Sequence, residues 1–379
     1  MQNDTSIASQ LVGRIMSVAD CHKALEMMKY CFDCRLDVNV QTILQASFVK
    51  DVAIIVSETY AMLEKYYHDQ WRNHISEYSK SYKATCERFR HSVHIPMLER
   101  NASDYYNNEI LLENFLNKET SFLIIEAKNV STIIWSDLYY SHLYAYTNEY
   151  TVASLQQDFN IIYGNLQEII NWNCKLSNKL DLSCAFKPIP KEEHFIAIAE
   201  RVMPCKTFFN NKKIKPSNIL KLLTCKIEIN SALIFLESGS LSELLDQSDW
   251  IYFVTKWLAI KYDEVFDCLY RMKTYDDQDK NFLLTVLSGN KYKSVCPLDS
   301  NVRKMAQQLR NMCHYVKFNK IIDEHSTHHL GQSTYDFDKV VFTIMGNQQG
   351  YKGMKSLFNK MLCDLKVIDK FIDEVLCSV

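Results

Sequence analysis

The amino-acid sequence predicts an all-α fold. Only 8 glycines and 6 prolines occur among 379 residues, and between Gly13 and Gly164 the sole residue of either kind is Pro96. Glycine and proline punctuate regular structure, so their scarcity favours long helices over sheets joined by many tight turns. Hydrophobic residues make up 47% of the chain and recur at helical spacing. That content is enough to build buried helical cores.

A proline-marked break predicts two packed helical bundles. The break contains Lys187-Pro188-Ile189-Pro190 and ends at Pro216. Proline-rich, polar stretches commonly separate domains. We therefore expect an N-terminal helical bundle over residues 1–185, a linker over 186–216 and a C-terminal bundle over 217–379.

Each predicted element in the two bundles is a helix. In the N-terminal half, apolar periodicity predicts helices near 5–18, 20–32, 41–66 and 68–94, with a further series across 105–180. In the C-terminal half, Ser217, Asp249 and Asp299 precede apolar runs and can bond the free N–H groups of a helix start. The corresponding helices are expected at 217–239, 249–272, 299–318 and 352–376.

Composition narrows the function classes. The net charge of −2 and pI near 6.6 provide no overall basic field, so a nucleic-acid partner would need a local patch. No glycine-rich phosphate loop of the dinucleotide-binding or P-loop type occurs. Thirteen cysteines, an odd number scattered through apolar runs, suggest reduced core thiols. A polar N-terminus and the lack of a long apolar stretch predict a cytoplasmic protein with no membrane partner.

Three groups of residues invite a metal-site interpretation, and for each we favour a simpler one. Cys31 and Cys34 form the single CxxC pair, too few ligands for structural zinc. Asp263 and Asp267 place carboxylates four residues apart, and the acidic cluster at 275–279 loosely resembles the Mg²⁺-binding aspartates of helical isoprenoid synthases, but no second motif follows. The histidines at 325–329 lie in a polar loop. We therefore predict no metal and no cofactor.

The helix predicted at 299–318 has two distinct stripes. Its apolar residues repeat every three or four positions and form a core stripe: Val302, Met305, Ala306, Leu309, Cys313 and Val316. A polar stripe with the same spacing runs beside it: Arg303, Gln307, Arg310, His314 and Lys317. On an uninterrupted helix, Arg310 and His314 would project from one face. An exposed helix flank is the simpler interpretation of this pair.

The segment Leu309-Arg310-Asn311-Met312-Cys313-His314-Tyr315 resembles the signature helix of HEPN-type proteins, the higher-eukaryote and prokaryote nucleotide-binding domains. That signature pairs an arginine, often followed by a polar residue, with a downstream histidine and frequently an aromatic residue. The gap here is three residues, shorter than the usual one. The resemblance implies a helical bundle in residues 217–379, and a ribonuclease or RNA-binding effector of a toxin–antitoxin or antiphage system.

The chemistry that this resemblance implies is metal-independent cleavage of RNA. His314 would take the proton of the attacking 2′-hydroxyl, and Arg310 would stabilise the charge that develops on the phosphate. Asn311 would bond the substrate or orient the histidine, and Tyr315 would stack on a base or simply pack. Arg303 and Lys317 extend the basic face toward the RNA.

A second Arg/His pair, Arg90 and His94, has the same spacing, with Arg88 close by. Two such motifs suggest an intramolecular tandem of HEPN-like bundles, with a homodimer as the alternative and an exposed helix end as the simpler interpretation. A basic segment with interleaved phenylalanines also offers RNA contacts or a solvated linker: Lys206, Phe208, Phe209, Lys212, Lys213 and Lys215.

Two functional hypotheses remain open from the sequence. One is an endoribonuclease or RNA-binding effector, with a regulatory protein partner. The other is a noncatalytic helical module for protein interaction or assembly, in which both Arg/His pairs are structural.

Overall fold

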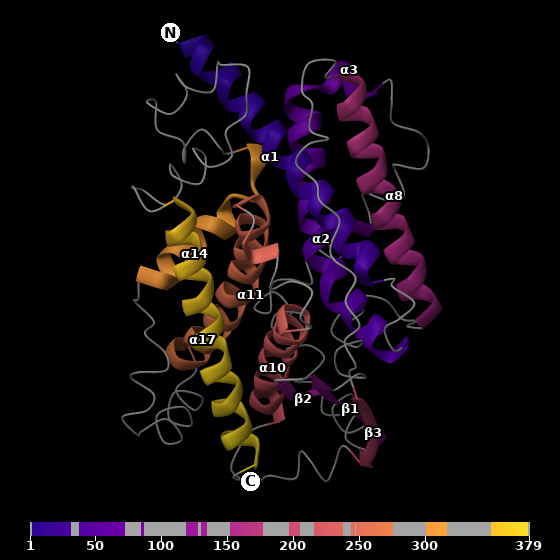
Figure 1. Cartoon of the computed structure of the whole chain (residues 1–379), viewed down its shortest axis with the longest axis vertical. Helices are drawn as coiled ribbons and strands as arrows, with labels where there is room; N and C mark the ends of the chain where they lie inside the picture. The colour runs from indigo at the N-terminus through magenta and orange to yellow at the C-terminus, as the bar shows by residue number, and fades with distance from the viewer. Residues whose placement is uncertain are drawn as a thin grey trace.

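Figure 1 shows the computed structural model of the chain. The structure describes residues 2–31, 38–72, 85–86, 119–127, 130–134, 152–176, 197–204, 216–237, 244–246, 248–275, 301–316 and 350–377. Packed helices dominate these residues, so the predicted all-α class is confirmed. Among the helices of this described part, none combines the length and the apolar character needed to cross a bilayer.

The first helical group consists of α1 (Gln2–Cys31), α2 (Val38–Tyr66) and α8 (Val152–Leu176), with the short α3 (His68–Arg72) following α2. Aromatic residues fill its core: the rings of Trp71 and Trp172 meet edge to face with centroids 5.2 Å apart. Two helices, near 5–18 and 20–32, were predicted where α1 is continuous. The predicted break between them is wrong, because Asp20 lies within the continuous helix, where it is buried and bonded to Tyr315.

The second helical group surrounds α11 (Ser248–Tyr275), which contacts α10 (Pro216–Glu237), α14 (Asn301–Asn311) and α17 (Gly350–Cys377). A short 3-10 turn, η2 (Leu244–Asp246), precedes α11. Every residue of α11 from Trp250 to Phe266 is buried. A helix covered on all sides has no solvent face for its charged residues, so each of them needs a partner inside the protein.

The predicted helices at 217–239, 249–272 and 352–376 are confirmed to within three residues at each end. The helix predicted over 299–318 is shorter, because α14 ends at Asn311. Beyond that point the amide of Cys313 donates to the carbonyl of Arg310, and that of His314 to the carbonyl of Asn311. Such three-residue spacing tightens the chain into turns rather than continuing the α-helix.

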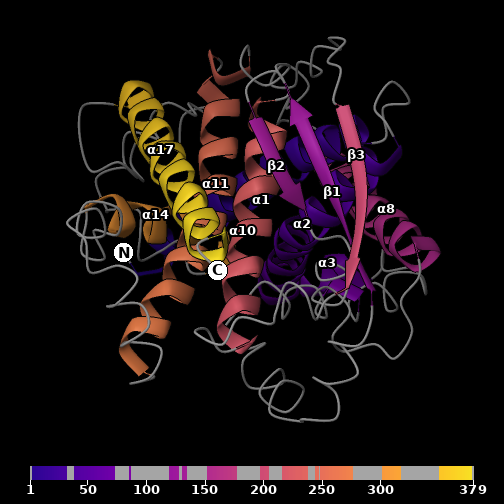
Figure 2. The same ribbon diagram turned by 90° about the horizontal axis from the view of Figure 1, so that it is seen from below.

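A small antiparallel sheet, which the sequence did not predict, stands beside α10. It consists of β1 (Glu119–Ala127), β2 (Val130–Ile134) and β3 (Ala197–Pro204) in the order β2-β1-β3. Helices were predicted across 105–180, where β1 and β2 lie, and β3 falls within the predicted linker. The scarcity of glycine and proline misled here, because β-branched residues such as those of β2 favour strands. Figure 2 shows the sheet on the side of α8, away from α17.

The two helical groups share a buried interface. Helix α2 contacts α10, and α1 contacts α11. Charged residues cross this interface in both directions. The two halves predicted from the proline-marked break are therefore in direct contact along these helices.

Candidate functional site

Helices α11 and α14 are joined by complementary charges. Arg310 donates from Nη1 to the Oδ2 of Asp263 at 2.5 Å, and its Nη2 lies 3.1 Å from Oε1 of Glu264. Two turns earlier on α14, Arg303 pairs with Asp267 at 3.6 Å. The arginines of the polar stripe therefore face the acidic run on α11 that the sequence analysis considered for a metal.

The carboxylates that hold Arg310 are nearly buried, whereas the guanidinium is about one-third exposed. Side-chain exposures are 2% for Asp263, 5% for Glu264 and 29% for Arg310. Burial raises the pKa of Asp263 despite the opposing charge of Arg310. Burial by itself lowers the pKa of Arg310, but the neighbouring Glu264 and Asp263 outweigh it and raise that pKa. Arg310 is thus firmly cationic and its charge is already balanced within the protein.

His314 is bound by a carboxylate from the other half of the chain. Its Nδ1 lies 3.0 Å from Oε2 of Glu58, which belongs to α2. Glu58 is 6% exposed and His314 is 33% exposed, so a buried anion holds a ring that still reaches solvent. When Nδ1 carries the proton and donates it to Glu58, Nε2 is the basic nitrogen of the ring.

Tyr315 belongs to the core. The residue is 1% exposed, and its hydroxyl donates to Oδ2 of Asp20 at 2.6 Å. Lys256 of α11 donates to the same oxygen. Of the two roles considered for Tyr315, packing and base stacking, the structure shows packing, because a ring enclosed in this way presents no face to a base.

Gly13 of α1 lets the turn that ends at Tyr315 approach α1 closely. A Cβ atom at that position would lie 2.6 Å from the carbonyl oxygen of Tyr315. Backbone atoms cannot move aside as a flexible side chain can. The absence of a side chain at Gly13 therefore lets α1 pack directly on the end of the motif.

The buried cysteine of the motif is expected to be unreactive. Cys313 is 2% exposed, and burial raises its pKa to about 12. Burial also raises the pKa of Cys21, on the facing helix α1, to about 12. A thiol with such a pKa is protonated at neutral pH and is a poor nucleophile. The chemically accessible part of the motif is therefore Arg310, the exposed Asn311 and His314.

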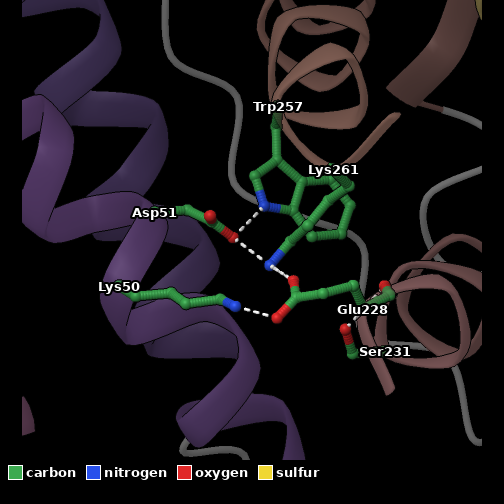
Figure 3. A network of polar contacts seen from close by, with 6 residues as sticks. All are labelled: Lys50, Asp51, Glu228, Ser231, Trp257 and Lys261. Carbon is green, nitrogen blue, oxygen red and sulfur yellow. Dashed lines mark hydrogen bonds and ion pairs between the residues drawn. The ribbon is translucent and has the colours of Figure 1, made fainter. Parts of the chain in front are cut away.

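A fully buried network of charges joins α2, α10 and α11 close to the site. Figure 3 shows Lys261 between two carboxylates, 2.7 Å from Asp51 and 2.8 Å from Glu228. Lys50 pairs with the other oxygen of Glu228, and the indole of Trp257 donates to Asp51 at 2.7 Å. Each of the four charged side chains is at most 2% exposed.

The network and the site share helix α2, which carries Asp51 of the network and Glu58 of the site. Asp51 and Glu58 are seven residues apart on α2, so both lie on one face. Ile54 lies between them and packs against Ile260 and Cys313. The network joins α2 to α10 and α11 through Lys50 and Asp51, which lie two turns before Glu58 on α2. It is enclosed on all sides, which suits a structural role rather than ligand binding.

Several predicted site residues lie outside the described part of the chain: Arg90, His94, Lys212, Lys213, Lys215 and Lys317. The tandem arrangement that rests on Arg90 and His94 stays a prediction. Among the described residues, Arg310 and His314 are one turn apart in the chain and Arg303 is two turns before them. No group of three or more potential metal ligands occurs in this part of the molecule.

The chain was compared with protein-family models, with curated proteins and with solved structures. None of them matches it. The HEPN resemblance therefore rests on the motif at residues 309–315 alone, and any function must be argued from the site itself.

Sequence reasoning missed Glu58, which belongs to no motif. A signal was nevertheless present, because Lys50, Asp51 and Glu58 interrupt the otherwise apolar run of α2. Charged residues in such a run must find partners when the helix is buried. The acidic run on α11 and the basic stripe on α14 likewise match in charge, which could have predicted that the two helices pair.

Proposed function

We propose that the protein is a metal-independent endoribonuclease in which Glu58 and His314 act together as the proton-transferring unit. The observation that carries the proposal is the 3.0 Å contact between Nδ1 of a partly exposed His314 and the nearly buried carboxylate of Glu58. A carboxylate in this position orients the imidazole and stabilises its protonated form, as in other histidine–carboxylate pairs that perform acid–base catalysis.

In the proposed reaction, Nε2 of His314 removes the proton from an RNA 2′-hydroxyl as that oxygen attacks the adjacent phosphorus. The bond to the 5′-oxygen breaks, and the products are a 2′,3′-cyclic phosphate and a 5′-hydroxyl end. The imidazolium formed on His314 is stabilised by Glu58. A protonated histidine, or water, supplies the proton that the leaving oxygen needs.

Among the described residues, Arg310 is the cation nearest to His314 along the chain, and it offers several N–H donors to a phosphate. Because Asp263 and Glu264 already bind the guanidinium, a phosphate either shares its outer edge or displaces one carboxylate. Activity of this kind would suit an effector that restricts growth in a toxin–antitoxin or antiphage system.

Substitution of His314 tests the proposal better than substitution of Arg310. Loss of Arg310 would leave two buried carboxylates without their cation, and the fold itself would suffer. His314→Gln removes the base but retains an N–H group that can bond Glu58. His68→Gln is the matched control, because His68 is an exposed histidine that contacts a neighbouring carboxylate, Asp69, at 3.4 Å.

We expect the wild-type protein and His68→Gln to cleave single-stranded RNA in the presence of EDTA and to leave 2′,3′-cyclic phosphate ends. His314→Gln should cleave at least about 100-fold more slowly, the usual contribution of a general base. Circular dichroism should show unchanged helix content in both variants. Wild-type protein that cuts no RNA, cleavage that stops with the chelator, or undiminished cleavage by His314→Gln would each overturn the proposal.

A second candidate function is a noncatalytic helical module for protein interaction. The charge balance of the site favours it: three carboxylates, from Glu58, Asp263 and Glu264, surround two basic groups, from Arg310 and His314. An acidic environment repels phosphate. Under this hypothesis His314→Gln lowers the free energy of unfolding by a measurable amount, and the wild-type protein cleaves no RNA.

A further inference from the structure

The outer face of α17 carries a line of lysines, which we call the lysine stripe: Lys352, Lys360, Lys366 and Lys370. All four are exposed, and the other exposed residues of the described helix, Ser356, Asn359, Cys363 and Val367, continue the same line. Their spacing of three and four places them on one side of the helix. In both views α17, together with α14, lies on the side of the molecule opposite α8.

Three acidic residues of α17 have partners on neighbouring helices, and one of them, Asp373, keeps a side chain that is 46% exposed. Asp369 and Asp373 both bind Lys226 of α10, at 2.9 and 2.8 Å. Asp364 accepts a hydrogen bond from the hydroxyl of Tyr262 at 2.9 Å. Buried partners on α10 and α11 therefore occupy these carboxylates, and α17 keeps its positive charges on the outside. Among the described residues of α17, the most exposed charged residues are therefore all lysines, on a protein whose net charge is −2.

The surroundings of the stripe favour an anionic polymer over a lipid surface. Among the described residues, Val367 is the large hydrophobic side chain that is exposed, and a single valine gives a bilayer little to take up. The stripe extends over roughly 27 Å, at 1.5 Å per helical residue, which is the length of several nucleotides of a single strand. Among the described side chains of α17, no aromatic residue is exposed, so contacts of the stripe would be made to phosphates and not to bases.

We propose that the lysine stripe binds the phosphate backbone of single-stranded RNA. The choice of RNA rests on the proposed function, whereas the basic character of the face does not. Binding of this kind is independent of sequence and depends steeply on salt, because each neutralised phosphate releases counterions. It also supplies, away from the acidic site, the positive charge that the site itself lacks.

The test compares two charge-matched pairs of substitutions in the full-length His314→Gln protein, which leaves the RNA intact. Lys360→Gln/Lys370→Gln removes two charges from the stripe. Lys29→Gln/Lys65→Gln removes two exposed lysines from α1 and α2. Binding of a fluorescein-labelled oligouridylate is followed by anisotropy between about 50 and 200 mM salt.

The stripe substitutions should make the negative slope of log affinity against log salt shallower by about 1.4, at about 0.7 per lost phosphate contact on a single strand. The control pair should leave the slope unchanged. Equal slopes for both pairs, or binding to phosphatidylserine vesicles with none to RNA, would overturn the proposal. If RNA binds through the stripe but the wild-type protein never cuts it, the proposed ribonuclease function fails and the proposed binding by the stripe stands.

Discussion

The buried network of Figure 3 gives the most quantitative test of how the two halves are held together. Glu228 on α10 is 2% exposed and is shared by Lys50 of α2 and Lys261 of α11. Glu228→Gln retains the shape of the side chain and removes its charge. Two buried lysines would then share the carboxylate of Asp51, and the network would carry an excess positive charge.

Removing one partner of a buried ion pair costs about 3–5 kcal/mol. The lower end applies here, because burial already lowers the pKa of Lys50 and of Lys261. One of these lysines can therefore release its proton and limit the penalty. A lysine whose pKa is lower in the folded state binds fewer protons there than in the unfolded chain, so the penalty is largest at low pH and shrinks as pH rises. We expect a loss of about 3 kcal/mol at neutral pH.

Urea unfolding, followed by circular dichroism, measures this loss as the free energy of unfolding. Lys50→Met combined with Glu228→Gln restores the balance of one lysine and one aspartate, so the double variant should regain about 2 kcal/mol over Glu228→Gln alone. Lys29→Gln, which breaks the exposed pair with Glu26, should change stability by at most about 0.5 kcal/mol. A cost below about 1 kcal/mol for Glu228→Gln would refute the reasoning. So would a double variant whose loss equals the sum of the losses measured for Lys50→Met alone and Glu228→Gln alone.

Two further predictions concern α1. Gly13→Ala should lower the free energy of unfolding by about 1–2 kcal/mol in the same urea experiment, because the clash with the Tyr315 carbonyl outweighs the better helix propensity of alanine; a stabilised variant would show that the contact is looser. Burial lowers the pKa of His22 from 6.5 to about 4. As pH falls through this window, from 6.5 to about 4, the unfolded chain therefore takes up a proton on this histidine before the folded protein does. Stability should fall by about 1.5 kcal/mol, after allowance for solvent contact, as pH drops through the window; an equal loss in His22→Gln would exclude His22 as the cause.

Much of the helical fold could be predicted because it depends on local signals. Apolar periodicity and the scarcity of glycine and proline located α2, α10, α11 and α17 closely. The pairing of β1 with β3 could not be predicted in this way, since it joins residues about 80 positions apart. The early end of α14 also depends on distant contacts, because Tyr315 turns inward to Asp20 on α1.

The candidate site was predictable in part. The motif drew attention to Arg310 and His314, but it contains no information about what faces them. Glu58 precedes His314 by more than 250 residues, and only the packing of α2 against the end of α14 brings them together. The same holds for the carboxylates of α11, which change Arg310 from a free phosphate ligand into one side of an ion pair.

The most direct test of the central claim is a double-mutant cycle on RNA cleavage, made with Glu58→Gln, His314→Gln and the combination of both. If the two residues form one proton-transferring unit, each single variant in EDTA should be much slower than wild type, and the double variant about as slow as His314→Gln alone. Independent effects that multiply, a Glu58→Gln variant as fast as wild type, or a wild-type protein that leaves RNA intact would contradict the account.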